Sequence, residues 1–293
     1  MSEKRIPSSQ RKTRATLDVN SSKNSSDKFI GVSLSGGKSD KACLALVEYY
    51  PDQKKIFLSK LIEKIKTEEM ISADLKIIEM INQFKADVKY IAFDVPLSLP
   101  TCITCQLKCP GYELCGEDEM KWMRQLYAKI NMKKKPKKMF TPYTQRCTEA
   151  YIAHELEESF EIHHALGSNS APLTARALFL QRRLDHDCIE VFPKLAVWRL
   201  GQMLRISKSH IKFHRHSNGG DVSRRIFIEA LADKFNLFIY EQDKKSMIEN
   251  NHAFEAFICA FVGYLKDQGK NEKRPAGFPK KQVWIEFPTG LKT

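Results

Sequence analysis

Short apolar runs separated by turn residues dominate the first part of the chain. FIGVSL at residues 29–34 is followed by a Ser-Gly-Gly turn, and apolar residues recur at 42–47 and 56–58. A Pro-Asp pair separates the second run from the third. Three short apolar segments joined by tight turns are typical of consecutive antiparallel strands. We therefore predict a three-stranded antiparallel meander at the start of the folded domain.

A helical pattern and a buried strand follow the meander. Thr67 is a suitable N-cap, and apolar residues recur at helical spacing between residues 71 and 84. The run VKYIAF at 88–93 is apolar enough for a strand buried on both faces, and the long crossover through a helix predicts that it pairs in parallel. It ends at Asp94, where open α/β sheets bind ligands. Alternatively, Asp94 caps the turn by accepting a backbone N–H.

Further helices and strands are predicted along the rest of the chain. Helices are expected at 144–159, 172–184 and 252–265, strands at 188–193 and 282–287, and a mixed helical and loop region at 194–247. We predict an α/β domain over 29–293, with a mixed sheet flanked by helices. Glu190 lies on an apolar strand face, where an unpaired carboxylate is unfavourable. Glu255 begins an apolar helix, where it faces protein or, alternatively, is exposed and favoured by the helix dipole.

The chain carries a strong excess of positive charge. It has 48 Lys and Arg against 35 Asp and Glu, which gives a net charge of +13 and a pI near 9.3. Such a balance suggests a polyanionic partner, with nucleic acid (DNA or RNA) as the first candidate. An internal lysine cluster is formed by Lys133, Lys134, Lys135, Lys137 and Lys138. We expect this cluster, Arg146 and Arg176 to contact phosphates, and a solvated loop is the alternative for the lysines.

The N-terminal segment has a composition of its own. Residues 1–28 are basic, rich in serine and poor in apolar residues, which favours a disordered basic tail over a transit peptide. The sequence has no run of about 18 apolar residues and no apolar secretory signal. We therefore expect no membrane segment and a cytoplasmic location.

Four of the eight cysteines lie close together within a Cys- and Lys-rich insertion expected at 101–140. They are Cys102, Cys105, Cys109 and Cys115, spaced C-x2-C-x3-C-x5-C. Clustered cysteines without a secretory signal favour metal over disulfides. Four thiolates suit either Zn²⁺ or an iron–sulfur cluster, and the spacing leaves both open. The HIKFHRH segment at 210–216 could also bind zinc, but the lack of nearby cysteines or carboxylates favours a basic surface segment.

Three acidic residues in apolar surroundings are candidates for one site. Asp94, Glu190 and Glu255 come from a strand end, a strand and a helix, which a crossover topology could bring together. Carboxylates at one spot repel each other, and divalent cations remove that repulsion. Hard oxygen ligands suit Mg²⁺ or Mn²⁺, and such ions assist phosphodiester hydrolysis. With the basic clusters, these residues predict a divalent-metal-dependent nuclease in which the three carboxylates are catalytic metal ligands.

Several longer segments resemble a known family. GVSLSGGKSDKACLAL, IAFDVPLSLP, IEVFPKL and AFEAFICAF occur in this order and are similar to the signatures of domain-of-unknown-function family 429. That family is described as predicted nucleases of RNase H-like fold. The resemblance covers about residues 29–290. It implies an RNase H-like mixed sheet flanked by helices, with a carboxylate site that binds divalent metal.

One position departs from the pattern that this resemblance implies. RNase H-like enzymes normally carry an aspartate in the first strand, where this chain has Ser33. Asp40 could supply the missing carboxylate from the following turn, or the second metal could be lost. A nucleic-acid-binding protein without catalysis is therefore an alternative function. A phosphotransferase of the actin and sugar-kinase kind, suggested by the turn at residues 35–38, would need a second such domain.

Overall fold

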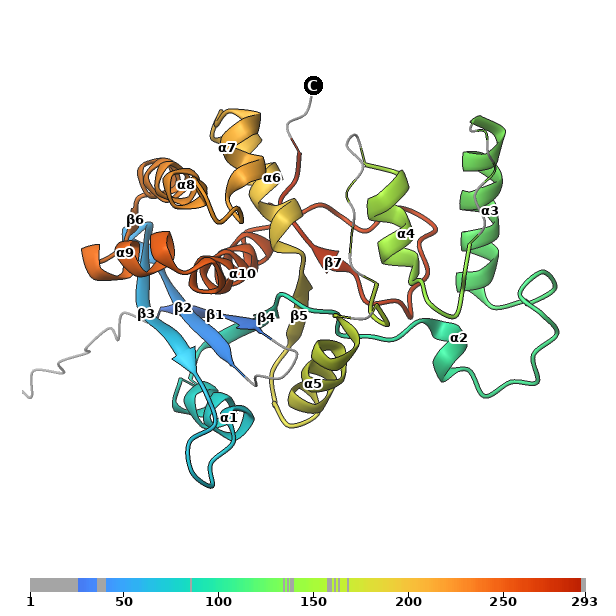
Figure 1. The fold of residues 1–293 in the computed structure, drawn as a ribbon, viewed down its shortest axis with the longest axis horizontal. Coiled ribbons are helices and arrows are strands. Elements are labelled where there is room, and N and C mark those ends of the chain that lie inside the picture. The colour runs from blue at the N-terminus through green and yellow to red at the C-terminus, as the bar shows by residue number, and fades with distance from the viewer. Residues whose placement is uncertain are drawn as a thin grey trace, which may run out of the picture.

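Seven strands form a mixed sheet at the centre of the protein in the computed structural model (Figure 1). The structure describes residues 26–35, 41–84, 86–133, 135, 137, 140–156, 160, 162, 164–167 and 169–290. The strands are β1 (Asp27–Leu34), β2 (Ala42–Tyr50), β3 (Lys55–Ile65), β4 (Val88–Phe93), β5 (Cys188–Val191), β6 (Leu237–Phe238) and β7 (Ile285–Glu286). Their order across the sheet is β6-β3-β2-β1-β4-β5-β7.

The pairing of the strands confirms the predicted mixed sheet. Strands β1, β2 and β3 pair antiparallel in sequence order, as expected for a meander. Strand β4 pairs with β1 in parallel, as its long helical connection predicts, and β5 and β7 add further parallel strands at the same edge. As a result, β1, β4 and β5 end at the same edge of the sheet.

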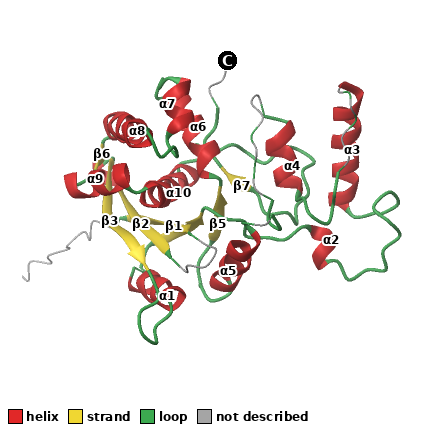
Figure 2. Cartoon of the chain, viewed as in Figure 1, coloured by secondary structure: helices red, strands yellow, loops and turns green. Residues whose placement is uncertain are grey.

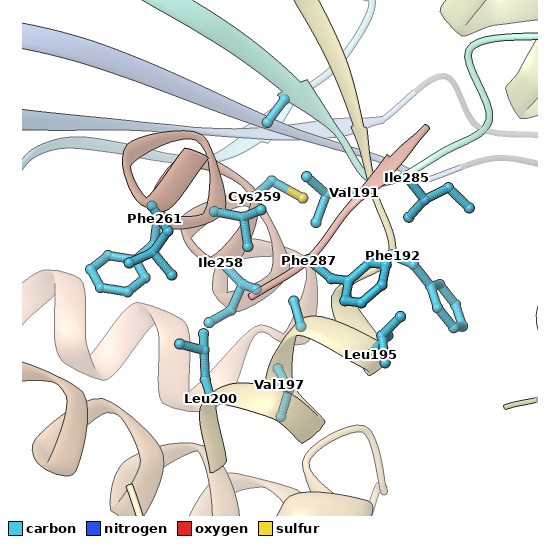
Figure 3. Packing of buried hydrophobic residues seen from close by; sticks show 14 of the residues in the cluster. Val191, Phe192, Leu195, Val197, Leu200, Ile258, Cys259, Phe261, Ile285 and Phe287 are labelled. Carbon is cyan, nitrogen blue, oxygen red and sulfur yellow. The ribbon is translucent and has the colours of Figure 1, made fainter. Parts of the chain in front are cut away.

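Helices cover both faces of the sheet (Figure 2). They are α1 (Ala73–Gln83), α2 (Thr101–Thr104), α3 (Asp118–Lys133), α4 (Cys147–His154), α5 (Ala171–Gln181), α6 (Pro193–Met203), α7 (Lys208–Phe213), α8 (Gly220–Phe235), α9 (Glu241–Glu249) and α10 (Asn251–Asp267). The smaller hydrophobic cluster joins α1 and α5 to one face of the sheet, and the larger one contains α10, α6 and α8 on the other. Figure 3 shows part of the larger cluster, where α6 and α10 pack against β5 and β7.

Helix α10 packs directly against β1 at Gly31. A Cβ atom on Gly31 would lie 1.9 Å from the carbonyl oxygen of Ala256 and 2.4 Å from the backbone nitrogen of Ala260. Only glycine permits this close approach of helix and strand. Side chains from Ala253 to Leu265 are buried along the helix. This contact fixes the start of α10, including Glu255, close to the end of β1.

Several element boundaries differ from the predicted ones. Helix α1 begins at Ala73 with Ser72 as its N-cap, whose hydroxyl accepts a hydrogen bond from the backbone nitrogen of Leu75 at 3.2 Å. Thr67 instead accepts from the backbone nitrogen of Ala73 at 3.0 Å, outside the helix. Helix α4 is shorter than the predicted 144–159 helix. Strand β1 begins at Asp27, inside the predicted 1–28 tail, and residues 1–25 lie outside the described residues.

The region expected to be a Cys- and Lys-rich insertion contains a long helix. Besides Glu119, helix α3 buries five apolar side chains: Met120, Met123, Leu126, Tyr127 and Ile130. These residues belong to the larger hydrophobic cluster, so the second half of 101–140 contributes to the core. The four clustered cysteines lie in α2 and in the loop between α2 and α3. Figure 1 shows this loop.

Candidate functional site

The three predicted carboxylates line one pocket at the carboxyl ends of the parallel strands. Asp94 directly follows β4, and its backbone nitrogen donates to the carbonyl of Val32 at 3.2 Å. Glu190 lies in β5 opposite Phe93, and Glu255 lies in the first turns of α10. The pocket has a volume of about 170 Å³, and Arg215 and His252 also line it. We refer to it as the carboxylate pocket.

Three side chains of the pocket have their potential ligand atoms close together. One atom each from Asp94, His252 and Glu255 lies within 4.8 Å of the other two. Within the described segments of the chain, this is the one group of three or more Asp, Glu, His or Cys residues with that spacing. Two carboxylates and an imidazole form a donor set that suits a divalent cation, and the imidazole favours Mn²⁺ over Mg²⁺.

Ser33 holds two members of this group in place. Its hydroxyl donates to Oδ2 of Asp94 at 2.6 Å and lies 3.0 Å from Nδ1 of His252. The other carboxylate oxygen, Oδ1, accepts from the backbone nitrogen of Leu34 at 3.0 Å. Because the hydroxyl proton is directed to Asp94, Ser33 accepts from Nδ1–H of His252, which leaves Nε2 with its lone pair. Ser33 is fully buried and acts as a positioning residue.

The charges in the pocket are not balanced around Asp94. Burial and, after it, the charge of Glu255 raise the pKa of Asp94 from 3.8 to about 7, against the hydrogen bonds from Ser33 and Leu34 and the charge of Arg215. Arg215 donates from Nε to Oε1 of Glu255, and its side chain stays 37% exposed. Two neighbouring carboxylates therefore share one arginine at the edge of the pocket. A bound cation would remove the repulsion between them.

Glu190 is held differently from the other two carboxylates. Arg146 binds it through two hydrogen bonds of 2.7 Å, from Nη1 to Oε2 and from Nη2 to Oε1. Oε2 also accepts from the backbone nitrogen of Leu97 at 2.9 Å. Both oxygens of Glu190 are bonded to a buried guanidinium, so its charge is balanced without a cation. The predicted role of Glu190 as a metal ligand does not fit this geometry.

Arg146 is the centre of a closed network. Its Nε donates to Oε1 of Glu149 at 2.7 Å, and its side chain is fully buried. His164 Nδ1 lies 2.9 Å from Oε2 of Glu149, and the backbone nitrogen of Ala165 donates to Oε1 at 3.0 Å. Burial favours a higher pKa for Glu149, but Arg146 and the hydrogen bond with His164 hold it below its ordinary value. The side chain of Arg146 has no access to solvent, so this conformation does not present it to a phosphate.

The other residues that were predicted to contact phosphate differ in their surroundings. Arg176 donates from Nε to Oδ1 of Asp74 at 2.6 Å and from Nη1 to the carbonyl of Lys41 at 2.9 Å, so it ties α5 to α1 and the first hairpin. Its guanidinium is used inside the protein, which does not fit the expected phosphate contact. The lysines that the structure describes in the cluster, Lys133, Lys135 and Lys137, are exposed. Lys134, Lys138, Asp40 and residues 36–38 of the suggested phosphate-binding turn lie outside the described residues.

The four clustered cysteines line a separate cavity of about 370 Å³. All four thiols are free, and no three of their sulfur atoms lie within 4.8 Å of one another in this described segment. The HIKFHRH segment is only partly a surface segment. His214 is buried, and its Nδ1 lies 2.8 Å from the carbonyl oxygen of Ile211.

Sequence reasoning missed two residues of the carboxylate pocket. His252 precedes Glu255 by three positions, and this spacing places both on one helix face, so the signal was present. Asn250 caps the helix by accepting from the backbone nitrogens of His252 and Ala253 at 3.0 and 3.4 Å. Arg215 lies 40 residues before its partner Glu255, and no local pattern indicates that contact.

A mixed α/β sheet with an acidic pocket at its strand ends defines the class of this protein. Its family follows from comparison with family models. The model of a family described as "Protein of unknown function (DUF429)" matches residues 63–279, which is well over half of the chain. The chain therefore belongs to this family.

Comparisons with curated proteins and with solved structures gave no significant match. No helix in the described part of the chain combines the length and the hydrophobicity needed to cross a membrane.

Proposed function

We propose that this protein is a divalent-metal-dependent nuclease that hydrolyses phosphodiester bonds of nucleic acid. The observation that carries the proposal is the convergence of Asp94, His252 and Glu255, whose ligand atoms lie within 4.8 Å of one another. A pocket at the carboxyl ends of parallel strands is where α/β proteins bind their ligands. An unbalanced pair of carboxylates, one buried and one partly buried, is a good site for Mg²⁺ or Mn²⁺ at that place.

We further propose that the sheet is of the RNase H-like kind. The support is the order β3-β2-β1-β4-β5, in which a three-stranded meander is extended by two parallel strands through helical crossovers. The family match is compatible with this fold. Fold alone is a weak argument for function, so the proposal depends on the residues of the pocket.

Each residue of the pocket has a distinct part in the proposed site. Asp94, His252 and Glu255 would hold the cation, which when bound activates water and stabilises the developing charge at phosphorus. Ser33 fixes the carboxylate of Asp94 and the tautomer of His252. Arg215, partly exposed at the pocket edge, can turn toward a phosphate group of the substrate. The Arg146–Glu190 pair holds the backbone of Leu97, which follows the lining residue Pro96.

Electrostatics support a nucleic-acid substrate. The net charge of +13 attracts polyanions, and the exposed lysines after α3 are free to contact phosphates. The eight cysteines are unpaired, as in proteins of reducing compartments, and we propose a cytoplasmic location.

Cleavage assays with single- and double-stranded DNA and RNA test the proposal. We expect hydrolysis with Mn²⁺, weaker hydrolysis with Mg²⁺, and none after chelation. Asp94→Asn should lower the rate by about a hundredfold or more, because it removes a carboxylate from the cation site. Asp52→Asn is the matched control, since Asp52 is exposed in a surface turn. Cleavage that survives both chelation and Asp94→Asn would contradict the proposal.

The second candidate is a nucleic-acid-binding protein without catalysis. It is favoured by Ser33, which occupies a strand position where a carboxylate ligand is expected and which offers no charge to a second cation. Binding that persists in EDTA, with no cleavage of any of the four substrates, would support this function over the nuclease.

A further inference from the structure

The cysteine cavity is distinct from the carboxylate pocket. The two cavities share no lining residue. Besides the four cysteines, the cysteine cavity is lined by Leu107, Pro110 and Tyr112 and by the charged residues Lys108 and Glu117. Four thiols from one short segment thus face a single space with a partly apolar wall. This arrangement is typical of a site for a metal centre with thiolate ligands.

The loop that carries the cysteines is anchored at one end and poorly packed elsewhere. Arg124 of α3 donates from Nη2 to the carbonyl of Cys115 at 2.9 Å and from Nη1 to the carbonyl of Tyr112. In contrast, Leu107 and Leu114 are 65% and 78% exposed. The loop therefore has no hydrophobic core of its own, and small segments of this kind are commonly held by a metal centre.

The spacing of the sulfur atoms distinguishes between the two kinds of centre. A tetrahedral Zn²⁺ with Zn–S bonds of about 2.3 Å would bring all four sulfurs to about 3.8 Å from one another. No three of these described sulfur atoms lie within even 4.8 Å. In an iron–sulfur cluster the thiolates bind different iron atoms around an inorganic core, so they lie farther apart and surround a larger space. The cavity of about 370 Å³ fits the second arrangement better than a single ion.

We propose that Cys102, Cys105, Cys109 and Cys115 bind an iron–sulfur cluster. The Cys109-Pro110 pair resembles the Cys-Pro step of bacterial ferredoxin-type runs, although here it follows the third cysteine and not the fourth. The cluster closes the loop between α2 and α3. This site does not depend on the proposed nuclease activity.

Metal analysis of the full-length protein tests the proposal directly. The protein is purified without oxygen, and its iron, acid-labile sulfide and zinc are measured together with its visible absorption. We expect about two to four iron atoms per chain with matching sulfide, and charge-transfer absorption that bleaches on reduction. Reconstitution of metal-depleted protein with iron and sulfide should restore the same composition and spectrum.

Two variants and the zinc content of the protein complete the experiment. Cys109→Ser should lose most of the iron and the absorption, whereas Cys188→Ser, which changes a free thiol in β5, should retain both. About one zinc per chain without iron would overturn the proposal. So would wild-type protein that takes up neither metal on reconstitution. If Cys109→Ser does not fold, the composition and spectrum of the wild-type protein decide the question.

Discussion

The carboxylates in and next to the carboxylate pocket form two groups that are held in opposite ways. Glu190 faces Arg146, which also binds Glu149, and the oxygens of both glutamates have donors from charged side chains or the backbone. Asp94 and Glu255 instead face each other, with a hydroxyl, one backbone N–H and the partly exposed Arg215 as partners. The first group is a closed network, and the second is deficient in positive charge.

The difference indicates which acidic residues are structural and which are available for binding. A buried carboxylate that is saturated by a bidentate arginine stabilises the fold as long as its partner is present. A carboxylate whose charge is opposed by a second one lacks such a partner, and a cation can supply it. Acidity and burial, which Glu190 and Glu255 share, are therefore insufficient to identify a metal ligand. The donors around each oxygen make the distinction.

The closed network should respond most strongly to the loss of its arginine. Arg146→Met leaves Glu190 and Glu149 buried without their main partner, and we expect the free energy of unfolding to fall by about 3–5 kcal/mol. Urea denaturation measures this change. Lys129→Met is the matched control, because its ion pair with Glu155 is partly exposed and should contribute about 1 kcal/mol or less. A loss below that of the control would show that the network is not a stabilising element.

We expect Ser33→Ala to weaken the binding of a cation by Asp94, His252 and Glu255. The hydroxyl holds both Asp94 and Nδ1 of His252, and loss of such an orienting partner lowers metal affinity by about 10–100-fold. Thermal shift with increasing Mn²⁺ measures the affinity, and unfolding in EDTA measures any change in the fold itself. Unchanged Mn²⁺ affinity would mean that Ser33 does not position the ligands.

The pH dependence of stability provides a smaller and finer test. Because the folded-state pKa of Asp94 is raised from 3.8 to about 7, the folded protein binds this proton more tightly than the unfolded chain. The stabilisation is complete below about pH 3.8 and is lost as pH rises through about 7. Glu255, His252 and Arg215 line the same pocket as this carboxylate.

In EDTA, the melting temperature of the wild-type protein should therefore fall relative to Asp94→Asn as pH rises between these limits. Saturating Mn²⁺ should reduce the difference, because the cation stabilises the ionised carboxylate. If the difference in melting temperature between wild type and variant stayed constant across this pH range, it would contradict the repulsion between Asp94 and Glu255.

Much of the sheet could be predicted because the sequence patterns that indicate its strands are local. Apolar runs with turn residues indicate the meander, and a carboxylate directly after a buried strand indicates the sheet edge where Asp94 lies. Gly31, inside a strand pattern, marks the close approach of α10. Strand β6 has only two residues, too few for a periodic pattern.

The partners of the acidic residues could not be predicted in the same way. Arg146 is 44 residues from Glu190 in the sequence, and Arg215 is 40 residues from Glu255. Only the fold brings these side chains together, so sequence reasoning grouped Glu190 with the two open carboxylates. The spacing of Met120, Met123 and Tyr127 indicates helix α3. The flanking clusters of cysteines and lysines favoured the prediction of an insertion instead.

Binding of Mn²⁺ to Glu255→Gln and Glu190→Gln tests the central claim most directly. Both changes are isosteric, and both residues line the carboxylate pocket. With isothermal titration on full-length protein, we predict one Mn²⁺ site in the wild type, near-normal binding in Glu190→Gln, and affinity lower by about a hundredfold or more in Glu255→Gln. Equal binding by Glu255→Gln and the wild type, or no Mn²⁺ binding by the wild type, would contradict it.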